Sequence, residues 1–223
     1  MADNPVLIGI RFALYADLML VAGLAAFPLY ALTAGERRGP QPMAAIWRME
    51  RWLCVIGLLV STLGMGALAA SMQGVALLSL EFQPFWDLVR ETDVGMAWVC
   101  RSAALLLALA AAIWLTRRPA MAAAILTLAG SIAVATLAWS GHAGATEGSA
   151  GTLHRVSDIL HLIAAAVWIG AIGAFLLLIS PRRIREIPDA ARLAARSLDQ
   201  FSHVGTICVL VIAATGLVNS QMI

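Results

Sequence analysis

The chain alternates between long apolar stretches and short polar ones. A membrane-spanning helix needs about 20 mostly apolar residues. The first stretch is too long for the apolar part of a cleavable signal peptide and has no basic residues before it, so we expect a true first span. The pattern predicts an all-α, polytopic transmembrane helix bundle. Its six spans are 6–32, 52–74, 95–115, 120–140, 154–180 and 202–221.

The arginines between these spans predict an orientation. Arginine is concentrated in the segments 33–51, 116–119 and 181–200. The segment 75–94 has one arginine against four acidic residues, and 141–153 has none. Because cytoplasmic loops carry an excess of basic residues, the arginine-rich segments belong inside the cell. We therefore expect both termini outside.

Two of the polar segments have helical patterns of their own. Within the outer interfacial segment 75–94, Glu81 to Thr92 mixes aromatic and acidic residues, which favours a short amphipathic helix at the membrane surface. Within 181–200, a cytoplasmic loop helix is predicted from Pro188 to Gln200, with proline in its first turn. This helix can continue directly into the last span. No repeat or second domain is visible, so residues 1–223 are predicted to form a single transmembrane domain.

Composition excludes several classes of protein. The chain is 61% hydrophobic and 13% charged, with a mean hydropathy of +0.86, whereas soluble domains carry about 25% charged residues. The net charge of +2 and the lack of a basic stripe argue against nucleic acid as a partner. Cys54, Cys100 and Cys208 lie far apart and form no CxxC motif, so we interpret them as core residues.

The most informative segment runs from Gly141 to Gly170. A polar, glycine-rich stretch carries His142 and leads into an apolar helix with His154, Asp158 and His161. Their spacing of i, i+4 and i+7 places these three side chains on one helix face. Ionisable groups within a span are costly and point to a functional site. The pattern indicates a metal or proton path, with Asp158 either as a ligand or as a partner that orients a histidine ring.

Other candidate residues follow from the predicted depth. Arg11 lies about 9 Å and Asp17 about 18 Å below the outer start of the first span, with Met19 near the depth of Asp17. His203 lies near the cytoplasmic end of the last span.

Met72 and Met96 share the outer face with His142 and His154, and imidazole together with thioether suits copper. Arg11, Asp17, Met19, Arg101 and Trp168 are candidate pathway or supporting residues; for Trp168 and the methionines, ordinary packing is the alternative.

Several of these motifs together resemble one family. They are GHA at 141–143, DILHLIAAAVWIG at 158–170 and FSH followed by TGLVN between 201 and 219. Arg11 with Tyr15, and Gly95 with Trp98 and Arg101, also fit. The sequence resembles the CopD/PcoD copper-resistance membrane proteins, which include the YcnJ-type copper importers. The resemblance covers nearly the whole chain and is densest from 141 to 219.

The resemblance implies copper transport across the bacterial inner membrane, from periplasm to cytoplasm, and a role in copper resistance or homeostasis. It also implies a periplasmic CopC-type copper-binding protein as partner, with copper, as Cu(I) or Cu(II), as the ion handled. On the family pattern fall Gly141, His142, Asp158, His161, Trp168, Phe201, Ser202, Thr215 and Gly216.

Three other functions are weighed against copper transport. A b-type haem electron-transfer protein needs two histidines at matching depth on facing helices. His161 and His203 differ by about 20 Å in the predicted topology, which argues against that pair, whereas His142 with His161 stays open if the loop dips into the membrane. A copper sensor or scaffold would carry a soluble signalling domain, and none is visible. No nucleophile constellation is present, so we do not expect an enzyme.

Overall fold

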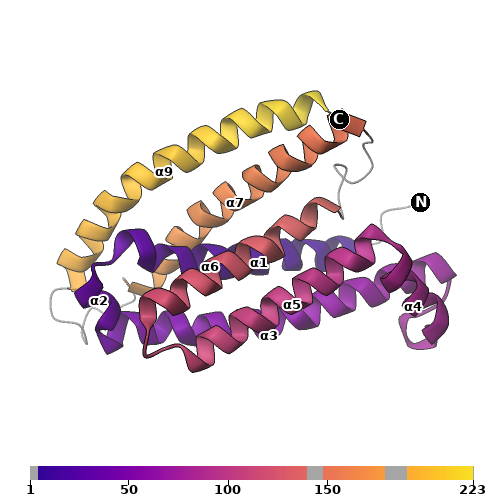
Figure 1. The fold of residues 1–223 in the computed structure, drawn as a ribbon, viewed down its shortest axis with the longest axis horizontal. Helices are drawn as coiled ribbons and strands as arrows, with labels where there is room; N and C mark the ends of the chain where they lie inside the picture. Colours follow the sequence, from indigo (N-terminus) through magenta and orange to yellow (C-terminus); the bar gives the residue numbers. More distant parts are fainter. Residues whose placement is uncertain (1–4, 140–147, 179–189, 223) are drawn as a thin grey trace.

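The computed structural model describes residues 5–139, 148–178 and 190–222. Within these residues, six helices are long and apolar enough to cross a membrane, which confirms the predicted all-α six-span bundle. The described ends of the first and last helices lie at the same end of the bundle (Figure 1). The elements are α1 (Pro5–Ala31), α2 (Ala34–Arg38), α3 (Pro40–Gln73), η1 (Leu77–Ser79), α4 (Phe82–Glu91), α5 (Asp93–Trp114), α6 (Pro119–Ala135), η2 (Thr136–Trp139), α7 (Gly148–Leu178) and α9 (Ala190–Gln221).

Helix α1 forms the centre of the bundle. It contacts α3, α6, α7 and α9, while α5 packs between α3 and α6. In the most apolar 18-residue stretch of each helix, 61% of α1 is buried inside the protein but only 17% of α9. Helix α9 lies at the edge of the bundle, beside α7 (Figure 1). The surrounding helices are therefore held together mainly by their packing against α1.

Two glycines set the closest approach of α1 to α7. A Cβ atom on Gly23 would collide with the backbone at Ala166 and Gly170, and one on Gly170 would collide with Gly23. Small residues at such a crossing let two helix backbones approach, which is how van der Waals packing drives association inside a membrane. This crossing fixes the position of α7, the helix that carries most of the candidate ligands.

The helix boundaries differ most from the predicted spans at the starts of three helices. Helix α7 begins at Gly148, six residues before the predicted start at 154. The second span was predicted to begin at residue 52, but α3 begins at Pro40 and its candidate membrane segment at Met43. The prediction was wrong because Arg48 and Arg51 suggested a loop. Both arginines lie on the exposed face of α3, while Glu50 between them is buried. The last helix begins at Ala190 and runs without interruption to Gln221, so the end of the segment 181–200 belongs to it.

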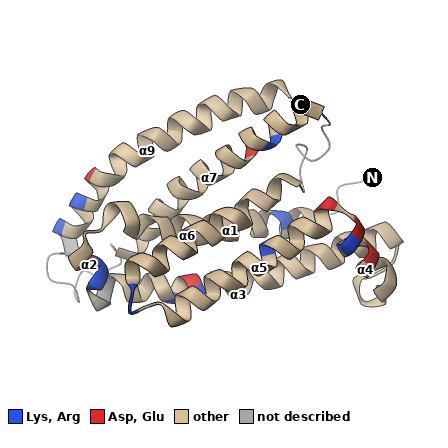
Figure 2. Cartoon of the chain, in the orientation of Figure 1, with Lys and Arg blue, Asp and Glu red and all other residues tan. Residues whose placement is uncertain are grey.

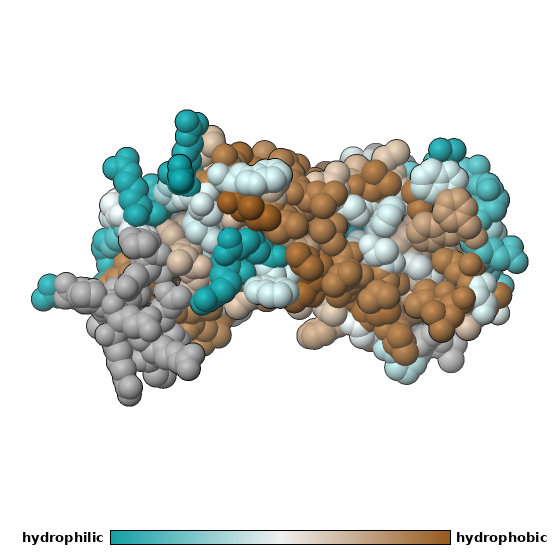
Figure 3. All heavy atoms as spheres, turned by 90° about the horizontal axis from the view of Figure 1, so that it is seen from below, coloured by the Kyte–Doolittle hydropathy of each residue, from teal (hydrophilic) through white to brown (hydrophobic). Residues whose placement is uncertain are grey.

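Charge and hydropathy are distributed as a membrane requires. On the face shown in Figure 3, apolar residues occupy the middle of the molecule, and hydrophilic residues gather towards its ends. Arginines cluster at the end of the bundle near α2, and the acidic residues of α4 lie at the opposite end (Figure 2). The end with the arginines is the one that the sequence assigns to the cytoplasm.

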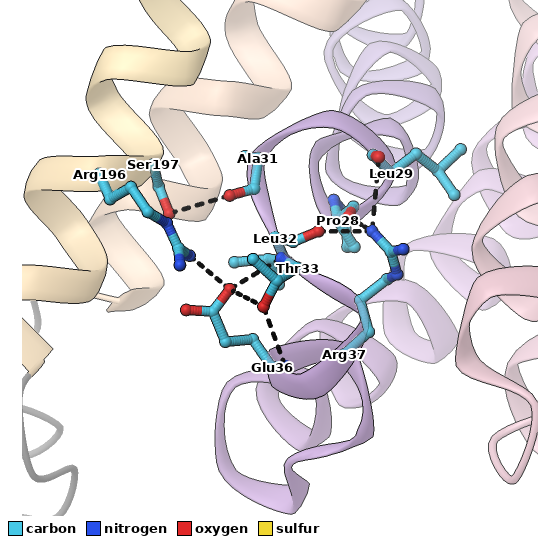
Figure 4. Close-up of polar contacts among 9 residues, drawn as sticks. All are labelled: Pro28, Leu29, Ala31, Leu32, Thr33, Glu36, Arg37, Arg196 and Ser197. Carbon is cyan, nitrogen blue, oxygen red and sulfur yellow. Dashed lines mark hydrogen bonds and ion pairs between the residues drawn. The ribbon is translucent and has the colours of Figure 1, made fainter.

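At this arginine-rich end, a polar junction joins α1 to α9 (Figure 4). Thr33 and Glu36 form a capping box at the start of α2, and Glu36 also accepts a hydrogen bond from Arg196 of α9. Arg37 donates to the Pro28 carbonyl at 2.9 Å and to that of Leu32, near the end of α1. These bonds satisfy carbonyl groups that the end of a helix leaves without partners.

The charge pair at this junction lies outside the spans. Partial burial pushes the pKa of Glu36 upward, but hydrogen bonds from Arg196 and Thr33 outweigh that effect, so its pKa lies below the ordinary value. The carboxylate of Glu36 is therefore ionised in the folded protein and anchors the start of α9.

Candidate metal pathway

Three predicted site residues follow one face of α7, which we call the α7 stripe: His154, Asp158 and His161. The structure keeps them in register on this helix, with His154 buried at 4% exposure and the other two half-buried. Asp158 lies close enough to interact through space with both imidazoles. A carboxylate flanked by two histidines in the membrane interior is an arrangement that can hold or pass a cation.

The lower end of the α7 stripe is joined to α9. His161 Nδ1 lies 3.0 Å from the Thr215 hydroxyl oxygen, and the Ser157 hydroxyl donates to the Thr215 carbonyl at 3.3 Å. The Thr215 hydroxyl itself donates to the Val211 carbonyl at 2.6 Å. Since its proton is used there, its oxygen accepts from His161 Nδ1–H. This assignment leaves Nε2 of a neutral His161 with the free lone pair that a metal requires.

A second group of polar side chains meets the α7 stripe from α1 and α5. The Tyr15 hydroxyl lies within electrostatic reach of Asp158, Arg11 and Arg101. Arg101 is 4% exposed, and its Nε donates to the Ser61 hydroxyl at 2.9 Å. Tyr15 therefore experiences the charge of a buried cation as well as that of the carboxylate of the stripe. Arg11 and Arg101 thus lie beside Tyr15, and neither forms an ion pair with Asp17.

The remaining candidates lie apart from the α7 stripe. Met72 and Met96 are 68% and 60% exposed at the outer end, and His203 is exposed on α9, where Nδ1 lies 3.3 Å from the Asp199 carbonyl. Trp168 is 40% exposed and lines an apolar groove with Phe201 and Gly205.

Two further predictions concern α1 and the segment before α7. Met19 packs against the main hydrophobic core. Asp17, two residues from Tyr15 and about 200° further around the helix, lies against Gly57 of α3 rather than beside Asp158. His142 lies outside the described residues.

No group of three His, Cys, Asp or Glu side chains within the described ranges converges on one point where it could hold a metal. The α7 stripe therefore supplies neighbouring pairs of ligands rather than a closed cage. A third ligand for its outer pair has to come from elsewhere, and His142 is the sequence candidate. Pairs in series suit an ion that must enter and leave.

Several polar residues in the interior were not among the predicted site residues; of those below, only Cys54 was assigned to the core from the sequence. Ser61 and Ser157 are buried and hydrogen-bonded across helices. Glu50 and Cys54 are both fully buried on α3. A signal for the last two existed, because residues 50, 54 and 57 follow the i, i+4, i+7 spacing of one helix face; the prediction that 33–51 forms a loop obscured it.

Comparison with known proteins agrees with this architecture. A family model described as "Copper resistance protein D-like, N-terminal domain" matches residues 1–152. "Copper resistance protein D" of Pseudomonas syringae pv. tomato is 36% identical over 221 residues, which cover 97% of this chain and 69% of the relative. "Inner membrane protein YebZ" of Escherichia coli (strain K12) is 27% identical over 223 residues, covering 97% of this chain and 71% of the relative.

No solved structure matches the chain significantly. The family model stops just before His154, but the similarity to both relatives extends over nearly the whole chain, α7 and α9 included. The family match, the two relatives and the six apolar helices lead to one conclusion: this chain is a multi-pass inner-membrane protein of copper resistance and belongs to the copper resistance protein D-like family.

Proposed function

We propose that this protein carries copper across the inner membrane from the periplasm to the cytoplasm. The observation that supports this proposal most directly is the α7 stripe, where two imidazoles and a carboxylate line one face of a helix inside the membrane. Imidazole and carboxylate both accept Cu(II), and neutral imidazole also accepts Cu(I). The copper-resistance family supplies the identity of the ion.

The route starts at the periplasmic end of α7. His154 and His142 capture the ion there, with Met72 or Met96 as exposed thioether donors at the same end, and a CopC-type periplasmic protein delivers it. Asp158 and His161 form the next position, where Thr215 holds the ring of His161. The proposal assigns no enzymatic reaction to the protein, only successive ligand exchange along the stripe.

The geometry opposes a haem held by His161 and His203. Thr215 is the residue of α9 that lies at the depth of His161, since their side chains are 3.0 Å apart. His203 lies twelve residues before Thr215 on the same helix, which corresponds to about 18 Å along the axis. The two histidines therefore cannot bind opposite faces of one haem. Because His203 is also exposed, we leave it out of the copper route.

Copper accumulation in cells tests the proposal. An Asp158→Asn, His161→Ala double variant that reaches the membrane in normal amounts should accumulate copper no faster than cells without the protein. The matched control is His203→Ala, which removes an imidazole without altering the α7 stripe and should retain wild-type accumulation. Normal copper accumulation by the double variant would contradict the proposed route.

The proposed direction requires the predicted orientation. Single cysteines at Ser149, before the α7 stripe, and at Ala190, at the start of α9, should react with impermeant reagents from opposite sides of the membrane, Ser149→Cys from the periplasm. The introduced thiols are read against a background in which the three native cysteines are replaced. Reaction of both from one side would refute the orientation.

A further inference from the structure

Apart from the α7 stripe, the interior holds a second set of ionisable side chains. Asp17 of α1 is 4% exposed, and Glu50 and Cys54 of α3 are both at 0%. Asp17 and Glu50 lie close enough to interact through space, and both also act on Cys54. We call Asp17 and Glu50 the carboxyl pair. It lies between α1, α3 and α5, and the proposed copper route does not use it.

The carboxyl pair lacks hydrogen-bond donors within the described part of the chain. None of the four carboxylate oxygens of Asp17 and Glu50 has a hydrogen-bond partner among the residues that the structure describes. A buried carboxylate without donors or a countercharge is unstable as an anion. Something other than the described side chains must therefore balance these two groups, and that can be a cation or a proton.

The elements around the pair present few groups that could compensate its charge. On α3 the titratable neighbour is Cys54. On α5, Leu105 lies close to Gly57, next to Asp17. The buried cation of α5, Arg101, donates a hydrogen bond to Ser61 and interacts electrostatically with Tyr15. Helix α6 contains no titratable residue, and the acid of α7, Asp158, also faces Tyr15. Among the residues that the structure describes, no fixed positive charge neutralises the pair.

The backbone makes room for the carboxyl group of Asp17. A Cβ atom on Gly57 would collide with Asp17 Oδ2, so this oxygen rests directly on the backbone of α3. Glu50, Cys54 and Gly57 follow one face of that helix at i, i+4 and i+7. This fit places the two carboxyl groups on the same side of α3.

A cavity at the arginine-rich end lies close to Glu50. The cavity, of about 350 Å³, is lined by Met43 and Trp47 of α3 together with Arg37, Arg38 and Arg117. Met43, Trp47 and Glu50 again share the i, i+4, i+7 spacing, so the cavity ends about one helical turn, roughly 5 Å, from Glu50 along the same face. Water in this cavity would bring solvent near to the carboxyl pair.

The number of available ligands decides whether a proton or a metal ion balances the pair. A metal needs several converging ligands, and no three His, Cys, Asp or Glu side chains in the described ranges are arranged to hold one. A proton needs one oxygen lone pair, and two neighbouring carboxyl groups can exchange it. Buried acidic residues that carry protons are a known element of membrane transporters.

We propose that Asp17 and Glu50 form a proton-binding site that exchanges protons with the arginine-rich side and couples their movement to copper transport. The coupling rests on the proposed copper function; the proton site itself does not. Each carboxylate that takes up a proton becomes a neutral acid, and no electrons are transferred.

Infrared difference spectra of the purified protein, recorded for pH steps above about 6, where exposed carboxyl groups stay ionised, test the proton site directly. The wild type should gain and lose the band of a protonated carboxyl group. Asp17→Asn and Glu50→Gln should each remove part of that change and the double variant all of it, whereas Glu91→Gln, on the exposed surface of α4, should leave it intact. A change that persists in the double variant would refute the site.

Copper flux into proteoliposomes tests the coupling. A pH gradient imposed across the membrane should change the initial rate of the wild type several-fold and that of the double variant not at all. Cys54→Ala should behave as wild type, because a proton site does not need a thiol. If the double variant still responds to the gradient, the carboxyl pair does not couple protons to copper. If copper titration shows that replacing Asp17, Glu50 or Cys54 removes one bound copper ion, the pair is a metal site and the proposal is overturned. If the wild type moves no copper, the proposed function and the coupling both fail, while the infrared result still decides the proton site.

Discussion

Replacing Thr215 by valine isolates the hydroxyl that positions His161. Valine keeps the shape of threonine but removes the oxygen that lies 3.0 Å from His161 Nδ1. The ring then loses the partner that fixes its tautomer and orientation, and Nε2 no longer points reliably towards an ion. The α7 stripe itself keeps all of its ligands, so we expect weaker copper binding rather than its loss.

The size of the effect on the site follows from the hydrogen bond to His161; the bond to the Val211 carbonyl, which is also removed, has its counterpart in the control variant below. A neutral hydrogen bond contributes about 0.5–1.5 kcal/mol, which corresponds to roughly 2- to 13-fold in an equilibrium constant at about 1.4 kcal/mol per tenfold. Partners that orient a ligating histidine are typically worth about 10- to 100-fold in metal affinity. The two ranges overlap near tenfold, and this is the expected loss of copper affinity at the lower part of the stripe.

Thr206→Val provides the matched control. Its hydroxyl donates to the Ser202 carbonyl at 2.7 Å, as that of Thr215 donates to Val211, but Thr206 is exposed and lies far from His161. The measurement is a copper titration against a competing chelator, with thermal unfolding recorded for both variants. If Thr215→Val and Thr206→Val bind copper equally well, the proposed role of Thr215 in orienting His161 is refuted.

Two further predictions concern stability. Gly170→Ala places a methyl group in the α1–α7 crossing and should destabilise the protein by about 1–3 kcal/mol, while Gly9→Ala, with nothing within 4 Å, should be neutral or slightly stabilising in thermal unfolding. Glu36→Gln should cost about 0.2–1 kcal/mol at neutral pH. Because the pKa of Glu36 is lowered in the folded state, its contribution is present above the pKa of the unfolded chain and lost as pH falls through the folded value, so the variant and the wild type should converge in acid.

The apolar pattern predicted the number and kind of elements well, because a span must satisfy its backbone hydrogen bonds internally and is apolar along most of its length. It predicted the start of α3 poorly. Arg48 and Arg51 point outward from a helix that already runs through them, and a count of charged residues cannot distinguish that arrangement from a loop. Burial of Glu50 between them is visible only once α1 and α5 are packed against α3.

For the site, sequence spacing was sufficient only within one helix. His154, Asp158 and His161 share a face because helix geometry dictates it. Contacts between helices could not be obtained this way. His161 meets Thr215 and Tyr15 faces Asp158 because the crossing at Gly23 and Gly170 sets the register of α7. Asp17, at a depth similar to that of the stripe, faces α3 instead, since depth alone does not fix the direction of a side chain.

Directional copper flux through the purified protein tests the central claim most directly. In proteoliposomes with a copper-sensitive dye inside, wild-type protein should admit copper well above the rate of protein-free vesicles. A His154→Ala, His161→Ala variant should fall to that background, while His203→Ala retains the wild-type rate. Wild-type flux equal to the protein-free rate, or full flux through the His154→Ala, His161→Ala variant, would contradict transport along α7.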